Sequence, residues 1–295
     1  MGRRIFRVGL TSFWMGVFGL LIFLPNWVAA QLPPGMAPFE TTKVADGVYS
    51  FRAFFHRNMF IVTDEGVIAT DPISPRAAQA MMEEIRKVTD KPVKYVVYSH
   101  WHWDHIPGGK VFADQGAKFI SHENCLKHFK ENPNPDVVIP TGTFRTRYDL
   151  KLGGKTLELR YFGRNHSDCL IVMRLPKEKI LFIVDIASVG SVGFRALPDY
   201  YPRDWARSLK EIEKLDFDRI IPGHGPPVAP RSAVTETREY VEDLIAAVQE
   251  ARKQGWSQDK AKQEIRLPKY EKWAFYNEWL PLNVERVWSS FHIGW

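Results

Sequence analysis

Residues 99–105 read Ser-His-Trp-His-Trp-Asp-His. Together with three later positions, this stretch supplies seven candidate metal ligands: His100, His102, Asp104, His105, His166, Asp185 and His224. Imidazole and carboxylate groups at this density are typical of sites for borderline divalent metals, whereas an ordinary core would hold them only at a large cost in desolvation. The sequence therefore predicts a metalloenzyme.

The spacing within this motif suits two metal ions. In an extended loop, side chains two positions apart point to the same side, so His100 and His102 can chelate one ion. A bend at Trp103 turns Asp104 and His105 toward a second ion. Four other histidines lack such partners and are interpreted as structural or surface residues: His56, His122, His128 and His292. Of these, His56 is expected nearest the site.

Short apolar runs bounded by turn residues predict strands, and the candidate ligands follow these strands. Residues 93–99 read as a buried strand ahead of the motif, and residues 180–184 read as a strand that ends at Asp185. Gly153-Gly154 predicts a hairpin turn, and the segment 74–88 predicts a helix with serine at its N-cap and proline in its first turn. Two strand-rich halves with interspersed helices predict an α/β (α+β) protein with two sheets packed face to face and helices outside.

The first 30 residues predict an export signal. Three arginines precede an apolar stretch over residues 8–24, and small residues follow up to Ala30. Cleavage after Ala30 would give an exported, periplasmic protein, and retention as a membrane anchor is the alternative. Arg3-Arg4 also weakly resembles a twin-arginine signal.

Composition supports a folded protein with a sizeable core, because the 295 residues are 45% apolar and 25% charged. The formal net charge of +6 falls to +3 without the leader arginines, so the charge balance does not indicate nucleic-acid binding. We expect four segments: a signal over 1–30, a linker over 31–42, a catalytic domain over 43–230 and a helical, aromatic-rich cover over 231–295. The alternative for the last segment is a lid over the metals.

The chain has two cysteines, Cys125 and Cys169. Export would permit a disulfide between them. Burial as free thiols is the commoner fate of cysteine and is the interpretation we favour. The sequence leaves the pairing open, as it does the oligomeric state.

The motif His-x-His-x-Asp-His, followed in order by single His, Asp and His positions, resembles the metallo-β-lactamase superfamily over roughly residues 43–230. The resemblance implies an αββα sandwich of two mixed β-sheets flanked by helices, with the metal site at one edge. It implies three ligands for a first ion, three for a second and one bridging carboxylate: His100, His102 and His166; Asp104, His105 and His224; and Asp185. Two zinc ions are expected, with iron or manganese as alternatives.

Departures from family patterns bear on the substrate. True β-lactamases commonly carry cysteine or serine where this chain has Asp185, and those with cysteine often have lysine where it has Ser188. The residues after His166 lack the Thr-Pro-Gly-His style of continuation common in glyoxalase II and quorum-signal lactonases. The resemblance thus implies a di-zinc hydrolase of a small ester, lactone or thioester, acting through a metal-bridging hydroxide that Asp104 orients, and the predicted signal implies its export.

Three alternatives stay open: a metallo-β-lactamase, an iron-dependent oxygenase resembling the persulfide dioxygenases, and a non-catalytic binding protein on the same fold. The complete set of seven ligands argues against the last two. The expected partner is a small-molecule substrate, with a membrane involved only if the leader is retained.

Overall fold

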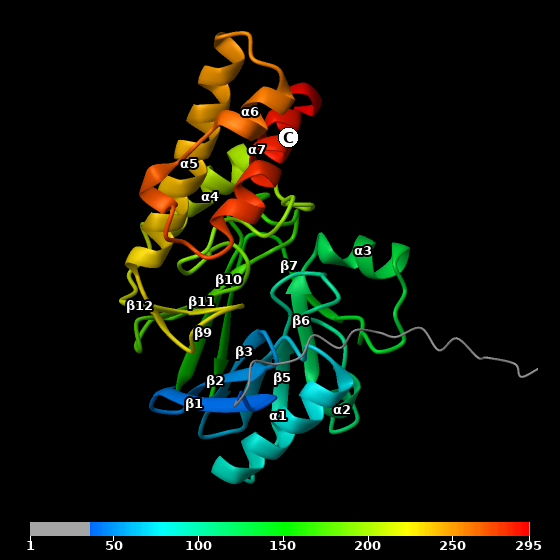
Figure 1. The fold of residues 1–295 in the computed structure, drawn as a ribbon. Coiled ribbons are helices and arrows are strands. Elements are labelled where there is room, and N and C mark those ends of the chain that lie inside the picture. The colour runs from blue at the N-terminus through cyan, green and yellow to red at the C-terminus, as the bar shows by residue number, and fades with distance from the viewer. Residues whose placement is uncertain (1–35, 295) are drawn as a thin grey trace, which may run out of the picture. The chain divides into compact units, whose positions relative to one another are not determined.

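The computed structural model describes residues 36–294, and the predicted signal peptide lies outside the described residues. Residues 37–294 form a single compact unit, which is shown in Figure 1. Its first strand begins at Phe39, inside the segment predicted to be a linker, because this strand pairs antiparallel with the next one. Among residues 36–294, no helix is both long enough and apolar enough to cross a membrane.

The first sheet has seven strands, in the order β1 (Phe39–Ala45), β2 (Val48–Ala53), β3 (His56–Val62), β4 (Val67–Thr70), β5 (Val93–Val97), β6 (Lys118–His122) and β7 (Gly142–Phe144). Its first four strands pair antiparallel and the remaining pairs are parallel, so the sheet is mixed. The parallel half is buried between helices and the second sheet, as parallel strands require.

The second sheet has six strands, in the order β13 (Ala229–Pro230), β12 (Arg219–Pro222), β11 (Ile180–Ile183), β10 (Val172–Leu175), β9 (Lys155–Arg160) and β8 (Arg147–Leu152). Only β11 and β12 pair in parallel. The predicted hairpin at Gly153-Gly154 joins β8 to β9, and both glycines have positive φ angles.

The helices are α1 (Pro75–Val88), α2 (Lys110–Ala113), α3 (Cys125–Glu131), α4 (Pro202–Ile212), α5 (Ser232–Lys253), α6 (Gln258–Glu264), the 3-10 helix η1 (Pro268–Tyr270) and α7 (Tyr276–Ile293). Helix α1 begins as predicted, since Ser74 Oγ accepts a hydrogen bond from the Ala77 amide at 3.1 Å and Pro75 occupies its first turn.

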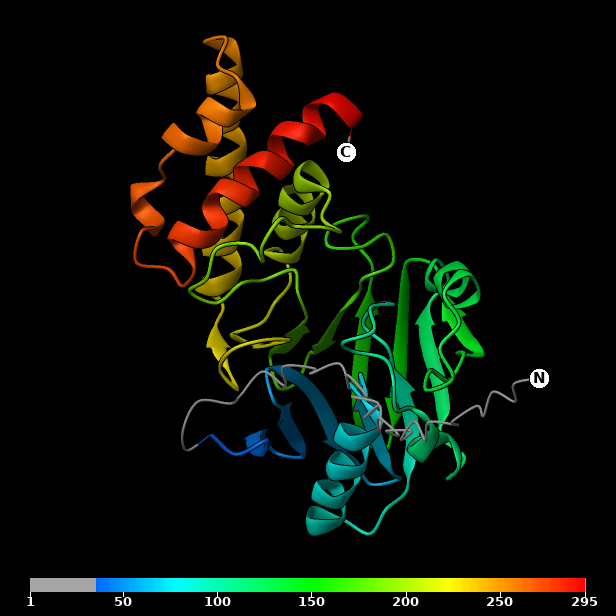
Figure 2. The same cartoon turned by 45° about the vertical axis from the view of Figure 1, so that its right-hand side comes forward.

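Three apolar clusters define four layers. One cluster packs α1, α2 and α3 against the first sheet, a second fills the space between the sheets, and a third packs the second sheet against the C-terminal helices. Strand β11 shows the alternation that this requires, because Ile180 and Phe182 face the other sheet while Leu181 and Ile183 face the helices. The predicted αββα sandwich of two mixed sheets is confirmed (Figures 1 and 2).

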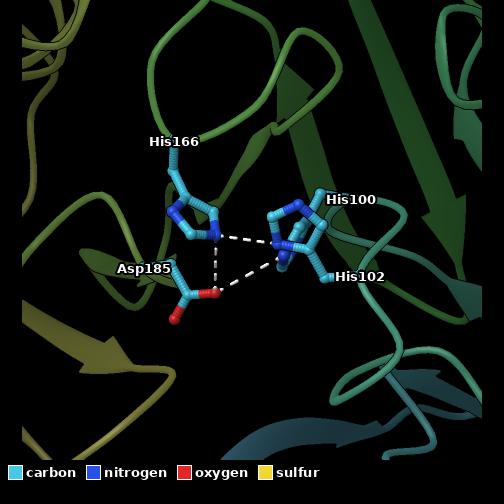
Figure 3. Close-up of side chains that lie close together, drawn as sticks. All are labelled: His100, His102, His166 and Asp185. Atoms are coloured by element: carbon cyan, nitrogen blue, oxygen red, sulfur yellow. Dashed lines mark hydrogen bonds and ion pairs between the residues drawn. The ribbon is translucent and has the colours of Figure 1, made fainter. Parts of the chain in front are cut away.

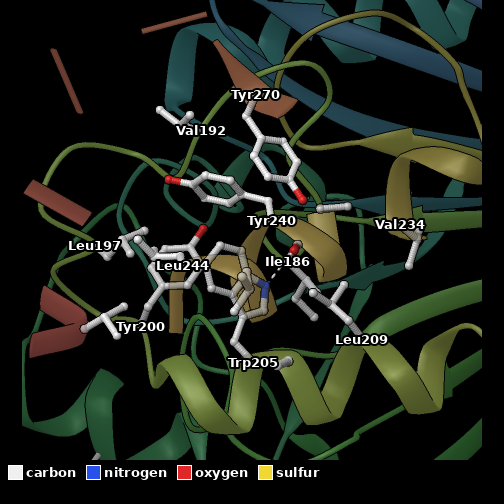
Figure 4. Packing of buried hydrophobic residues seen from close by; sticks show 14 of the residues in the cluster. Ile186, Val192, Leu197, Tyr200, Trp205, Leu209, Val234, Tyr240, Leu244 and Tyr270 are labelled. Carbon is white, nitrogen blue, oxygen red and sulfur yellow. Dashed lines mark hydrogen bonds between the residues drawn. The ribbon is translucent and has the colours of Figure 1, made fainter. Parts of the chain in front are cut away.

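The C-terminal segment is helical, as the sequence indicated. Helices α5 and α7 contact each other, and α5 lies beside α4 (Figure 2). Tyr240, Tyr270 and Trp205 are buried in the cluster under these helices (Figure 4). The aromatic side chains therefore serve mainly as core for the outer layer of the sandwich.

Cys125 and Cys169 form a disulfide, so the favoured interpretation of free thiols is wrong. Both residues are fully buried. Helix α3 starts next to the loop that follows His166, which brings the two Cα atoms to 5.4 Å. The bond ties this helix to that loop across 44 positions of sequence.

We expect the double change Cys125→Ala and Cys169→Ala to lower the free energy of unfolding by about 2–4 kcal/mol, because the bond restricts the unfolded chain. Urea unfolding of the wild type and the variant at neutral pH measures this difference. A reductant should lower the stability of the wild type toward that of the variant and leave the variant unchanged. Equal stability of the two oxidised proteins would contradict the expectation.

Candidate metal centre

The seven predicted ligands come from four segments, each of which follows a strand. The motif residues His100–His105 follow β5, and His166 follows β9. Asp185 comes two residues after the end of β11, and His224 comes two residues after the end of β12. Rigid strands fix the starting points of these loops, which is how a sandwich holds several side chains in one geometry.

Three histidines and one aspartate gather at the first position (Figure 3). The His102 Nδ1 and His166 Nε2 atoms lie 2.9 Å apart. Asp185 Oδ2 lies 3.4 Å from both His100 Nε2 and His166 Nε2. Ligand atoms of a tetrahedral zinc ion, each about 2.0–2.1 Å from the metal, are about 3.3 Å apart. The separations therefore fit one shared ion.

The second position is made by Asp104, His105 and His224, again around Asp185. His105 Nε2 lies 3.2 Å from Asp185 Oδ2 and 3.5 Å from Asp104 Oδ2. His224 Nε2 lies 3.0 Å from the other oxygen of Asp185. The structure thus brings all seven predicted residues together, with the Asp185 carboxylate between the two groups.

Two backbone features place this carboxylate. Asp185 itself has a φ of 33°, in the left-handed region that non-glycine residues seldom adopt. At the neighbouring strand end, a Cβ added to Gly223 would lie 2.6 Å from Val184 Cγ1. Glycine therefore allows the segment carrying His224 to approach the residue that precedes Asp185.

Burial keeps the histidines of the first group neutral. It lowers the pKa of both His102 and His166 to about 4 and holds the pKa of His100 well below its usual range. Neutral imidazole is the form that binds a metal, so these three side chains are ready to coordinate at neutral pH.

Charge dominates in the second group. Burial disfavours a proton on His105, but the Asp104 and Asp185 carboxylates outweigh it and raise the pKa of His105 to about 10. Burial likewise opposes the charge of Asp185, yet His105 and His224 hold its pKa well below the usual range. Positive charge is therefore needed beside these carboxylates, and a divalent cation can supply it in place of protons.

Outer partners fix the orientation of several rings. Ser99 Oγ lies 2.8 Å from His100 Nδ1, and His224 Nδ1 lies 2.9 Å from the Phe55 carbonyl oxygen. These contacts leave the Nε2 atoms of both rings facing Asp185. Such partners set the tautomer of a ligating histidine.

Two residues that the sequence analysis did not assign to the site belong to its surroundings. His56, expected only as a neighbour, has its Nε2 atom 3.4 Å from Asp104 Oδ2 and groups with Asp104 and His224. Asp71 is fully buried at the end of β4, accepts a hydrogen bond from the Ser99 amide at 2.7 Å, and has its pKa raised to about 6 by burial. His56 opens β3 and was expected only as a neighbour of the site, whereas Asp71 is a lone polar residue after β4 and carries no sequence signal that would have identified it.

The tryptophans of the motif differ in their surroundings. Trp101 packs against the first-sheet core and stacks on His128, whose Nε2 atom lies 2.7 Å from Asp168 Oδ1. Trp103 has an exposed fraction of 56% and does not pack into the core. Trp101 is therefore a packing residue, whereas Trp103 is largely exposed beside the site. A small cavity of about 130 Å³ adjoins Trp101 and is also lined by His102, Asp199 and Arg286.

Comparison with known proteins places this arrangement in a family. The alpha subunit of a 2,4-dinitroanisole O-demethylase from a Nocardioides species is 27% identical, and the match covers 61% of this chain and 54% of that protein. A linear primary-alkylsulfatase from a Pseudomonas species is 23% identical, and the match covers 70% of this chain and 49% of that protein. The chain thus spans about half the length of these two relatives. A type 2 metallo-beta-lactamase from Bacillus cereus is 28% identical, covering 61% of this chain and 70% of that protein.

The fold has a counterpart among solved structures. A metallo-beta-lactamase from Pontibacter korlensis superposes with a TM-score of 0.62 at 22% identity, covering 70% of this chain and 99% of that one. The family model described as "Metallo-beta-lactamase superfamily" matches residues 52–224. Since this match covers more than half of the chain and includes all seven candidate ligands, the protein belongs to the metallo-beta-lactamase superfamily.

Proposed function

We propose that this protein is an exported di-zinc hydrolase that acts on a small ester, lactone or thioester. Membership of the superfamily and the histidine and aspartate groups support a metal-dependent, hydrolase-type function. The observation that carries the proposal is the meeting of two donor groups at one carboxylate, Asp185. Zinc, the acyl substrate and export are parts of the proposal.

The donors fit the proposed metals. His100 Nε2 and His105 Nε2 are buried without a hydrogen-bond partner, although buried nitrogen atoms normally have one. In the proposed assignment, one ion would be held by three histidines and the other by one carboxylate and two histidines, and Asp185 would serve both: His100, His102 and His166; Asp104, His105 and His224. Nitrogen and carboxylate oxygen donors in this number suit zinc.

When bound, two zinc ions would polarise a substrate carbonyl oxygen and lower the pKa of a shared water toward neutrality. The chain itself supplies the positioning groups. Asp104 is the more exposed of the two carboxylates and faces His56 and His105, so it can orient water by accepting a hydrogen bond. Asp185 is almost completely buried, which excludes it as a free base and suits it to hold both donor groups together.

Acyl bonds other than β-lactams are favoured by two residues. Asp185 stands where true β-lactamases commonly carry cysteine or serine, and Ser188 stands where those with cysteine often have a lysine for the substrate carboxylate. The Ser188 amide donates a hydrogen bond to Thr237 Oγ1 of α5, and that hydroxyl donates to the Ser188 carbonyl oxygen. Serine supplies no cationic side chain at this position. A substrate without a carboxylate therefore matches this site better.

A second candidate function is β-lactam hydrolysis. The similarity to the Bacillus cereus metallo-beta-lactamase favours it. The alkylsulfatase and demethylase relatives add sulfate esters and aryl ethers as bonds to be compared. An iron oxygenase or a non-catalytic protein would retain fewer of the seven ligands.

We propose that export precedes function. The buried disulfide between Cys125 and Cys169 supports this proposal, since such bonds persist in oxidising compartments. Mass spectrometry of protein taken from the native cell envelope should find a mature N-terminus at Gln31. Detection of the intact 1–30 segment on membrane-bound protein would instead favour an anchor.

Asp185→Asn should lower zinc content and hydrolysis together, because the change keeps the size of the side chain but removes the charge shared by both donor groups. We expect about two zinc ions per chain in the wild type and at most about one in the variant, with turnover reduced at least about a hundredfold. Elemental analysis and steady-state kinetics measure both quantities. The control is Asp46→Asn, which changes an exposed carboxylate between β1 and β2 and should alter neither. Full metal content and full turnover in Asp185→Asn would rule out the bridging role.

A substrate panel tests the choice of bond. Lactones, thioesters, β-lactams, a primary alkyl sulfate and an aryl methyl ether should be compared by kcat/KM, which measures discrimination in the transition state. We expect a lactone or thioester to be the best substrate. A β-lactam that is better by more than about tenfold, equivalent to ~1.4 kcal/mol, would replace the acyl-hydrolase proposal with a lactamase. Iron in place of zinc in the purified protein would point to the oxygenase alternative.

A further inference from the structure

The loop over residues 186–201 forms one wall of the metal centre and contacts its ligands directly. Tyr200 donates a hydrogen bond from its hydroxyl to the Asp185 carbonyl oxygen at 2.5 Å, and its ring lies 4.4 Å from the His166 ring. Asp199 Oδ2 lies 3.5 Å from His102 Nε2, the nitrogen on the far side of the ring from the candidate metal donor Nδ1. The two atoms are at an ion-pair distance without a hydrogen bond, so the carboxylate acts through its charge, which favours a proton on Nε2 and leaves Nδ1 free for metal.

The backbone of this loop is unusual. Arg195 and Leu197 have φ angles of 46° and 48°, in the left-handed region. Residues with a side chain persist in this region only where their surroundings hold them there. The conformation that delivers Asp199 and Tyr200 to the ligands therefore needs external support.

Helix α7 gives that support at the same two residues. Asn283 Nδ2 donates to the Arg195 carbonyl oxygen at 2.6 Å and to the Gly193 carbonyl oxygen at 2.9 Å. Arg286 donates from Nε to the Leu197 carbonyl oxygen at 3.3 Å and from Nη2 to the Tyr200 carbonyl oxygen at 2.6 Å. Both left-handed residues are thus held through their carbonyl groups by one helix face.

Neighbouring segments hold the helix and the loop in turn. Tyr240 of α5 donates to Asn283 Oδ1 at 2.6 Å, which fixes the orientation of the amide. The Ala274 amide donates to the Gly190 carbonyl oxygen at 2.9 Å. Apolar packing of Leu197, Tyr200 and Trp205 fills the space beneath the loop (Figure 4). The matched family region ends at residue 224, so α5 and α7 lie outside it.

We propose that helix α7 holds the loop 186–201 in its strained conformation and that Arg286 is a positioning residue for the metal ligand His102, acting through Asp199. The inference rests on the proposed zinc site. The C-terminal segment was interpreted above as either a cover or a lid over the metals. In this proposal, helix α7 has a third role, because it sets the geometry of the first metal position.

Arg286→Met tests the inference, since methionine keeps an apolar stem and removes the guanidinium donors. Zinc affinity is measured by chelator competition on the full mature chain, together with the visible spectrum of the cobalt form and the melting temperature of the metal-free protein. We expect a loss of zinc affinity of about tenfold or more, with a changed cobalt spectrum. Arg286→Lys, which retains one donor, should recover part of the loss.

Arg252→Met is the matched control. The guanidinium of Arg252, a residue of α5, packs on Trp288 and Phe291 of α7 rather than on the loop 186–201. Its loss should lower the melting temperature comparably but change zinc affinity by less than about twofold. Unchanged affinity and spectrum in Arg286→Met, or equal losses in both variants, would overturn the inference.

Asp199→Asn tests the route. Asp199 is half exposed, so its replacement should leave folding intact. The single change should by itself lower zinc affinity. In the double variant with Arg286→Met, zinc affinity should fall by no more than about a further twofold, because both changes act on His102. Losses that multiply would overturn the route through Asp199. Failure of the wild type to bind zinc would instead overturn the proposed function, and this inference with it.

Discussion

The Asp185 carboxylate is the constraint on which the rest of the site depends. A buried anion is tolerated only where positive charge or several donors face it. Here His105 and His224 lie 3.2 and 3.0 Å from its two oxygens, and His166 of the first group lies 3.4 Å from Oδ2. Protons on the imidazoles or metal ions between them can balance that charge, and the neutral state of the first group leaves room for a metal.

The sandwich meets this constraint by ending separate strands at the same edge. Strands β5, β9, β11 and β12 each lead into one ligand segment, so none of the seven side chains depends on a long unsupported loop. The departures from regular backbone are local. Asp185 adopts a left-handed φ angle, and Gly223 permits close approach to Val184. Part of the backbone strain thus lies where the ligands converge.

Sequence reasoning could predict the parts governed by local pattern. Short apolar runs bounded by turn residues located strands such as β5 and β11, a serine-proline pair located the start of α1, and the density of histidine located the metal centre. Strands β6 and β7 and helix α3 were missed because they are short and carry little periodicity. The disulfide was left open because pairing depends on a tertiary distance, and His56 was placed no more closely than as a neighbour because only the folded chain brings it to Asp104.

The metal ligands and the groups that support the wall of the metal centre lie in different parts of this chain. The ligands all lie within the matched region, whereas the groups that hold the loop 186–201 lie after it. A loop with two left-handed residues can take another shape when its supports differ. Relatives that share the ligand motif can therefore present different walls to their substrates, which is consistent with lactamase, sulfatase and demethylase names among the similar proteins. Substrate choice in this protein should accordingly be sought in the contacts between α7 and that loop as well as at Asp185 and Ser188.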